Sequence, residues 1–289
     1  MRFRILFACL AAGSIGLAGC QTTKGAGGAS VPSAAASLGD CPAPSAKIAT
    51  TASGCSVYRE FGPKTLRSQP PPSKVFVLMH GDVSRGGGKI DYIYAVAESY
   101  AARMTAAGLD DFAIVTPARQ GFSDKAGAKS SGARLKRDMY PRRVVDQSAE
   151  FLAFVRSKAP AARITVVGHS GGAAIAGVIA GEKRGLADAY VFVGTPGDVP
   201  RWRREYRTNS TWPRSLSPHA VVASTDPAAR YVVITGPEDD STPMPLAQAY
   251  ADLLKAAGRE VELVSLPDTT HNQLMRRGDT VREIVQAAP

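Results

Sequence analysis

The chain has 289 residues, 44% hydrophobic and 21% charged, which indicates a globular protein with one large core or two small ones and excludes a chain disordered throughout. Its formal net charge of +10 suits a nucleic acid, an anionic membrane or an acidic substrate as partner, or simply a soluble surface. No nucleic-acid-binding motif or basic-aromatic array accompanies the charge, so we expect no nucleic-acid partner.

The N-terminal segment, residues 1–19, has a basic start, a short apolar stretch and then small residues, the pattern of a secretory signal. The apolar stretch is too short for a comfortable transmembrane helix. Its end resembles a bacterial lipobox, which implies that Cys20 is lipidated and becomes the first mature residue. The alternative is an ordinary signal peptide with a chance cysteine. Gln21 follows Cys20, and by resemblance to enterobacterial sorting signals this implies the outer membrane of a bacterial envelope, facing the periplasm.

Residues 20–45 contain almost no large apolar side chain, so we predict a flexible tether there, followed by one folded domain over residues 46–289. Cys41 and Cys55 are an even pair in an oxidising compartment, and we expect a disulfide bond between them. Two free buried thiols are the alternative. The cysteine spacing does not match a zinc or redox motif and no histidine is near, so we expect no metal site there.

From residue 74 onward, short apolar runs alternate with amphipathic stretches. We predict strands at residues 74–81, 112–117, 163–168, 189–194, 230–236 and 260–267. We predict helices at residues 90–108, 144–160, 172–183, 245–258 and 273–287. Continuous valine and isoleucine runs between amphipathic helices predict an α/β fold, with a mostly parallel central sheet covered by helices on both faces.

The segment VVGHSGGAAIAG, residues 166–177, places Ser170 in a G-x-S-x-G pattern between a predicted strand and a helix rich in alanine and glycine. In this context the serine lies on a sharp turn, and the glycines make room where the helix returns along the strand. The N–H groups at the start of the helix point to where an oxyanion would form. We therefore predict Ser170 as a nucleophile, with a glycine-rich packing turn as the alternative.

A serine hydroxyl needs a base, and the chain has four histidines. His169 neighbours Ser170 on the turn, where adjacent side chains point apart. His80 ends a predicted strand, where we expect a structural hydrogen-bonding role, and we expect His219 in a lid or on the surface. His271 lies between the last predicted strand and the last helix. We therefore predict His271 as the general base.

The base needs a carboxylate to orient it, and the segment VVITGPEDDSTP, residues 232–243, places Asp239 and Asp240 just after a strand. An acid after one strand and a histidine after the next give the chain order Ser, Asp, His. On these residues, together with HGD at residues 80–82 and ARQGFSD at residues 118–124, the chain from about residue 57 to 289 resembles an α/β-hydrolase of bacterial secreted or lipoprotein type.

This resemblance implies roles for several positions. The C-terminal half is similar to prolyl-oligopeptidase-like and related esterase domains, whose G-x-x-D-x-x-x-P motif supplies the acid and here matches Asp239, with Asp240 as the competitor. The HGD segment is similar to the family's oxyanion loop, which implies that the N–H groups of Gly171 and Asp82 form the oxyanion hole. An acidic residue at position 82 is a departure, and its side chain must turn away from the developing negative charge. No metal or organic cofactor is implied.

A short cap insertion is expected near residues 197–217. It contains three aromatic residues, Trp202, Tyr206 and Trp212, and four arginines, Arg201, Arg203, Arg204 and Arg207. One interpretation is a small aromatic lid with a basic rim that receives an anionic or lipid-like substrate; the other is a solvated amphipathic helix. A second basic cluster, residues 134–143, is predicted to be solvated surface.

Together these patterns predict an envelope-anchored serine hydrolase that cleaves small carboxylic esters or other acyl substrates through an acyl-enzyme. A peptidase or amidase of the same fold is the first alternative. A non-catalytic envelope binding protein that retains the hydrolase scaffold is the second. The motifs are specific for the superfamily and do not name a substrate.

Overall fold

The computed structural model describes residues 47–83, 86–207 and 211–289. The predicted signal, the lipidation site Cys20 and the disulfide partner Cys41 lie outside these ranges, so lipidation and the Cys41–Cys55 bond stay predictions. Cys55 itself is fully buried in a strand. Among the described residues, no helix combines the length and the apolar character needed to cross a bilayer.

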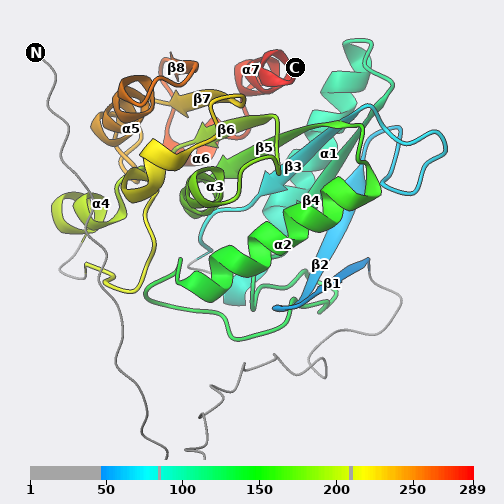
Figure 1. The fold of residues 1–289 in the computed structure, drawn as a ribbon, viewed down its shortest axis with the longest axis horizontal. Coiled ribbons are helices and arrows are strands. Elements are labelled where there is room, and N and C mark those ends of the chain that lie inside the picture. Colours follow the sequence, from blue (N-terminus) through cyan, green and yellow to red (C-terminus); the bar gives the residue numbers. More distant parts are fainter. Residues whose placement is uncertain (1–46, 84–85, 208–210) are drawn as a thin grey trace, which may run out of the picture. The chain divides into compact units, whose positions relative to one another are not determined.

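One eight-stranded sheet forms the centre of the domain, in the order β1-β2-β4-β3-β5-β6-β7-β8 (Figure 1). The two N-terminal strands pair antiparallel with their neighbours, and the other strands pair parallel. The strands are β1 Ile48–Thr51, β2 Gly54–Phe61, β3 Lys74–Met79, β4 Phe112–Pro117, β5 Arg163–His169, β6 Ala189–Val193, β7 Arg230–Thr235 and β8 Val261–Ser265. The predicted mostly parallel sheet is confirmed, and the antiparallel pair β1–β2 was not predicted.

Helices cover both faces of the sheet. The helices are α1 Asp91–Ala106, α2 Arg142–Lys158, α3 Gly171–Glu182, α4 Val199–Tyr206, α5 Met244–Ala256, α6 His271–Leu274 and α7 Gly278–Ala287, with short 3-10 turns η2 Gly86–Gly88 and η3 Pro218–Ser224. Helices α1 and α7 contact each other over one face, and α2 and α3 contact each other over the other (Figure 1). The predicted α/β architecture with helices on both faces is therefore confirmed.

The prediction of one final helix over residues 273–287 was wrong, because this segment contains the end of α6 and all of α7. The chain turns between Met275 and Arg277, and Arg277 has extended backbone angles. The hydroxyl of Thr280 donates a hydrogen bond to the Leu274 carbonyl oxygen at 2.5 Å. A side chain from α7 thus satisfies a terminal carbonyl of α6, which lets the chain change direction without leaving that group unpaired.

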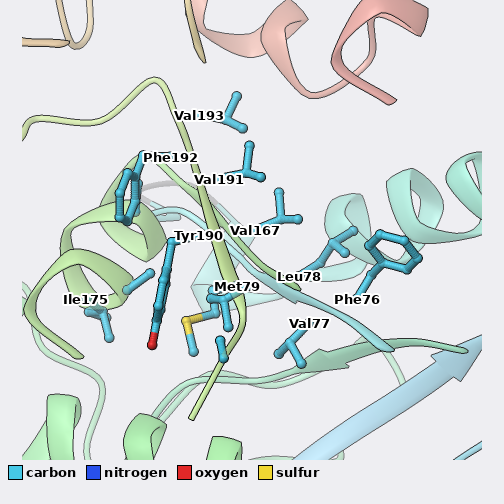
Figure 2. Packing of buried hydrophobic residues seen from close by; sticks show 14 of the residues in the cluster. Phe76, Val77, Leu78, Met79, Val167, Ile175, Tyr190, Val191, Phe192 and Val193 are labelled. Atoms are coloured by element: carbon cyan, nitrogen blue, oxygen red, sulfur yellow. The ribbon is translucent and has the colours of Figure 1, made fainter. Parts of the chain in front are cut away.

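The core explains why the central strands are uniformly apolar. Val77, Leu78 and Met79 of β3 and Phe192 of β6 are almost completely buried, because helices cover the sheet on both sides (Figure 2). Ile175 of α3 is also fully buried in this cluster. In a parallel sheet both sets of alternating side chains need apolar surroundings. The rigid core fixes the carboxyl ends of β5, β7 and β8, and functional loops follow all three.

Candidate active site

Ser170 lies on the turn between β5 and α3 with φ 52° and ψ −116°, a backbone conformation that L-residues rarely adopt. Two glycines allow this turn. A Cβ on Gly172 would collide with the carbonyl oxygen of Met79 in β3, and a Cβ on Gly168 would lie 2.5 Å from the Ala173 Cα. The N–H groups of Ala173 and Ala174 donate to the Ser170 carbonyl oxygen at 2.9 and 3.1 Å, which starts α3 directly after the serine.

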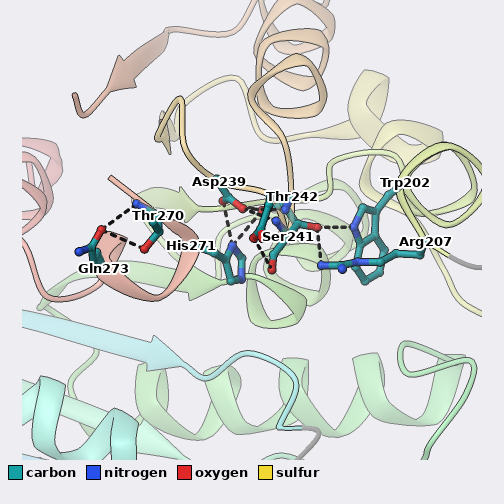
Figure 3. A network of polar contacts seen from close by, with 9 residues as sticks. Trp202, Arg207, Asp239, Ser241, Thr242, Thr270, His271 and Gln273 are labelled. Atoms are coloured by element: carbon teal, nitrogen blue, oxygen red, sulfur yellow. Dashed lines mark hydrogen bonds and ion pairs between the residues drawn. The ribbon is translucent and has the colours of Figure 1, made fainter. Parts of the chain in front are cut away.

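His271 is the first residue of α6, and its Nδ1 lies 2.8 Å from Oδ2 of Asp239 (Figure 3). The Asp239 side chain is buried and accepts further hydrogen bonds from the N–H groups of Ser241 and Thr242, at 2.9 and 2.7 Å, and from the Thr242 hydroxyl at 2.9 Å. Burial acts to raise the pKa of Asp239, but His271 and the Thr242 donors outweigh it and hold this pKa below its usual value. The carboxylate is therefore ionised at neutral pH.

The structure brings Asp239 to the histidine, whereas Asp240 is exposed and contacts the Ser241 hydroxyl at 3.4 Å. Close approach of two loops makes the Asp239–His271 contact possible. A Cβ on Gly236, at the end of β7, would collide with the Thr269 carbonyl oxygen, two residues before His271. Glycine at position 236 therefore lets the turn that contains Asp239 pack closely against the loop that precedes His271.

Ser170 and His271 line the same cavity, which has a volume of about 670 Å³. Trp202 and Trp212 line this cavity too, and their rings meet edge to face with centroids 5.7 Å apart. Tyr206, the third aromatic residue expected to contact substrate, lines a separate hollow on α4 and not the cavity with Ser170. Tyr206 is therefore not among the residues that line the cavity with Ser170, and its expected contact with substrate stays a prediction.

The prediction of a solvated basic surface at residues 134–143 needs a correction at its start. Arg134 and Lys136 line the cavity that contains Ser170. The irregular chain between β4 and α2 crosses to the mouth of the active-site cavity, and this path leaves no periodic signal in the sequence. The cavity wall thus includes residues that sequence reasoning assigned to bulk solvent.

The Asp82 carboxylate remains in the cavity wall beside Gly171, where a Cβ on the glycine would collide with it. Two groups hold the carboxylate. Arg119 Nη2 lies 2.7 Å from Oδ1, and the Tyr140 hydroxyl donates to Oδ2 at 2.6 Å. The Arg119 guanidinium, itself buried, offsets the negative charge that position 82 brings to the expected oxyanion hole. The motif at residues 118–124 contains Arg119, but the sequence predicted neither this contact nor the one made by Tyr140.

Hydrogen bonds at His80 and Gly81 fix the loop that leads to Asp82. The His80 Nδ1 lies 2.8 Å from the Gly81 carbonyl oxygen, and its Nε2 accepts from the Arg119 N–H at 3.1 Å. The Gly81 N–H donates to the Tyr92 hydroxyl at 2.7 Å. His80 therefore makes structural hydrogen bonds, as expected from its place at the end of β3.

The other two histidines differ in surroundings. His219 is half-exposed on η3, and its Nδ1 lies 2.7 Å from the Ser217 hydroxyl. His169 is buried, and its ring centroid lies 4.9 Å from that of His271. Burial first, and then the charge of His271, lower the pKa of His169 to about 3. His169 is thus an uncharged imidazole packed beside His271 at neutral pH.

Within the described ranges, no cluster of histidine, cysteine and acidic residues suits a metal ion.

The buried His169 predicts a specific acid sensitivity. An unfolded histidine titrates near pH 6.5, so as pH falls from about 6.5 toward 3 the unfolded chain gains a proton that the folded chain excludes. This difference lowers the free energy of unfolding by up to about 1.4 kcal/mol per pH unit. Denaturant unfolding at pH 7, 6, 5 and 4 should show a smaller loss of stability in His169→Phe than in the native sequence. The control His219→Phe should follow the native sequence, and equal losses in all three would contradict the assignment.

Comparisons with known proteins agree with this geometry. No family model matches the sequence, and a search of curated proteins finds no relative. Solved structures do match. Pyrococcus horikoshii acylaminoacyl peptidase is similar with a TM-score of 0.57 and 15% identity, over 79% of this chain and 37% of that protein. The chain therefore spans little more than a third of the peptidase.

Two smaller proteins are covered almost completely. An α/β serine hydrolase without a lid from Xanthomonas campestris has a TM-score of 0.53 and 15% identity, over 84% of this chain and 92% of that one. A thermophilic esterase, Est2 of Thermogutta terrifontis, solved with butyrate bound, has a TM-score of 0.56 and 15% identity, over 84% and 91%. These likenesses, together with the sheet order and the turn at Ser170, show that the chain has the α/β-hydrolase fold.

Proposed function

We propose that this protein is a serine hydrolase that cleaves carboxylic esters through an acyl-enzyme. One observation carries the proposal. The His271 imidazole is hydrogen-bonded to the buried Asp239 carboxylate at 2.8 Å, and it lines the same cavity as Ser170, which stands on a strained turn at the start of α3. A base, an orienting acid and a serine hydroxyl around one cavity are the parts of acyl transfer to serine.

The hydrogen bond between His271 and Asp239 determines which nitrogen of the imidazole can act as the base. Because the Asp239 carboxylate accepts a hydrogen bond from His271 Nδ1–H, the lone pair of the neutral imidazole lies on Nε2. Nε2 accepts the Ser170 hydroxyl proton while Oγ attacks the ester carbonyl carbon, and it returns the proton to the alcohol that leaves. Water then attacks the acyl-enzyme with His271 again as base, and the acid product is released.

The negative oxygen of the tetrahedral intermediate needs donors that are already in place. We assign this role to the N–H groups of Gly171 and Asp82. Gly171 is the first residue of α3, so its N–H is one of the unpaired donors of a helix N-terminus. The Arg119 and Tyr140 contacts support the Asp82 assignment, since they fix the residue and offset the charge of its carboxylate.

The share of each matched structure that this chain covers favours ester hydrolysis over peptide or amide hydrolysis. The chain covers most of the esterase that binds butyrate but only 37% of the acylaminoacyl peptidase. Amide cleavage on the same scaffold remains the first alternative. A non-catalytic binding protein is the second, and it predicts no turnover of any acyl compound.

Replacement of the nucleophile tests the reaction class. Ser170→Ala should fold normally and lose at least about three orders of magnitude in turnover of 4-nitrophenyl butyrate, because the attacking oxygen is removed. Ser157→Ala, which changes an exposed serine on α2, is the matched control and should keep full activity. Hydrolysis by the Ser170→Ala protein at the native rate would refute the proposal.

The two neighbouring aspartates offer an internal comparison. Asp239→Asn should cut turnover sharply, because an asparagine can donate to Nδ1 and so favour the wrong imidazole tautomer. Asp240→Asn should have little effect, since Asp240 is exposed and does not contact His271. Steady-state rates of both variants on the same activated ester show which aspartate orients His271. A crippled Asp240→Asn with a normal Asp239→Asn would reverse the assignment of the acid.

We propose further that the protein is a lipoprotein of the bacterial envelope, anchored through Cys20. The lipobox-like sequence that ends at Cys20 and the tether-like composition of residues 20–45 support this localisation. Metabolic labelling with a radioactive fatty acid should mark the native protein and Cys9→Ser, in which the cysteine inside the signal is changed, but not Cys20→Ser. Label on Cys20→Ser would contradict the anchor.

A further inference from the structure

Cationic side chains from two distant parts of the chain line the cavity of Ser170. Arg134 and Lys136 come from the segment between β4 and α2, and Arg203 and Arg207 come from α4 and its C-terminal end. The only acidic residue that lines the described part of this cavity is Asp82. Its carboxylate is already paired with Arg119, so the cavity wall carries a clear excess of positive charge.

The α4 cations are held at fixed positions. Arg207 Nη2 donates to the Ser241 carbonyl oxygen at 2.8 Å, and the indole N–H of Trp202 donates to the same oxygen at 2.7 Å (Figure 3). The Ser241 N–H in turn donates to Asp239. The turn that orients the proposed catalytic acid therefore also positions a guanidinium on the cavity wall. The Arg203 guanidinium lies 4.4 Å from the ring centroid of Trp212.

The segment between β4 and α2 contributes the other two cations. Arg134 Nη1 donates to the Val83 carbonyl oxygen at 3.1 Å, next to the proposed oxyanion loop. Lys136 is exposed. Within residues 47–83, 86–207 and 211–289, neither residue has a carboxylate at ion-pair distance, and neither does Arg207. Two positive groups from this segment thus line the same cavity as the α4 arginines.

Several arginines that do not line the cavity form ion pairs. On α4, Arg201 and Arg204 form ion pairs with Glu205, and on α2 Arg142 pairs with Glu182. Burial, and after it the neighbouring Arg207, lower the pKa of Arg203, while Tyr140 and Asp82 act in the opposite direction. An anion between the two arginines would relieve their repulsion, and a cleft lined by charge of one sign concentrates ligands of the opposite sign.

We propose that the physiological substrate is an ester that carries an anionic group, a carboxylate or a phosphate, which binds between α4 and residues 134–136 while the ester carbonyl lies at Ser170. The indole rings of Trp202 and Trp212 supply apolar surface for the carbon chain between the two groups. This inference rests on the proposed ester hydrolysis and names the substrate class of that same site.

Paired esters of equal chain length test the inference. The probes are the 4-nitrophenyl esters of adipic acid, of hexanoic acid and of 5-phosphonopentanoic acid, in which four methylene groups separate the ester carbonyl from a carboxylate, a methyl group and a phosphonate. We expect kcat/KM for at least one anionic ester to exceed that of the hexanoate ester about tenfold or more, and to fall toward it as salt is raised. A preference for the phosphonate over the adipate ester would assign the anion to the phosphate class, and the reverse to the carboxylate class.

Variants of Lys136 separate charge from structure. Lys136→Gln should lower the ratio of anionic to neutral kcat/KM several-fold, whereas Lys136→Arg, which keeps the charge, should retain the ratio. Arg204→Gln is the matched control, because Arg204 lies on α4 but does not line the cavity. The ratio is the readout because a purely structural defect would lower the rates of both esters together.

Failure of this inference can be told from failure of the proposed function. A wild-type ratio near one, with Ser170-dependent cleavage of the hexanoate ester, would overturn the anion site and leave the hydrolase intact. If no ester is cleaved, calorimetric titration of Ser170→Ala with monomethyl adipate and with dimethyl adipate still decides. Tighter binding of the monoanion, lost in Lys136→Gln, supports the site, and equal binding of both compounds refutes it.

Discussion

The left-handed backbone of Ser170 is the constraint on which the rest of the site depends. A non-glycine residue in a sparsely populated region costs about 1–3 kcal/mol, and surrounding structure must hold it there. The largely buried β5 and α3 do this, because glycines at 168 and 172 let the helix start against the end of β3. The same constraint raises the hydroxyl above the carboxyl edge of the sheet, where the loops after β7 and β8 bring the acid and the histidine.

The turn after β7 joins the proposed catalytic acid to two residues of the cavity wall. Asp239 receives N–H groups from Ser241 and Thr242, while the carbonyl oxygen of Ser241 accepts from Trp202 and Arg207. One short turn thus orients the imidazole on one side and fixes an indole and a guanidinium on the other. Movement of the cap would be transmitted to the acid through a single peptide unit, which ties recognition of the substrate to the alignment of the proposed base.

Local sequence patterns predicted many of the strands and the candidate catalytic residues. They did not predict contacts between residues far apart in the chain. The strand at residues 112–117 was predictable to the residue, because a fully buried parallel strand is uniformly apolar. Asp239 was singled out by resemblance to the G-x-x-D-x-x-x-P motif of related hydrolases, and it is the residue that contacts His271. Arg119 and Tyr140 were not predictable as partners of Asp82, since they lie 37 and 58 residues away and no periodicity relates them. The break between α6 and α7 was missed although the hydrogen bond from Thr280 to the Leu274 carbonyl oxygen spans only six residues, because the apolar periodicity of the segment does not show it.

The central claim is that Ser170 is an activated nucleophile, and the most direct measurement is covalent capture by a fluorophosphonate probe. Full-length protein treated with the probe should gain the mass of one phosphonyl group, and peptide mapping should locate it on Ser170. Labelling should slow greatly in His271→Ala, because the serine then lacks its base. No labelling, or a phosphonyl group on a residue other than Ser170, would contradict the account and favour a non-catalytic binding protein on a hydrolase scaffold.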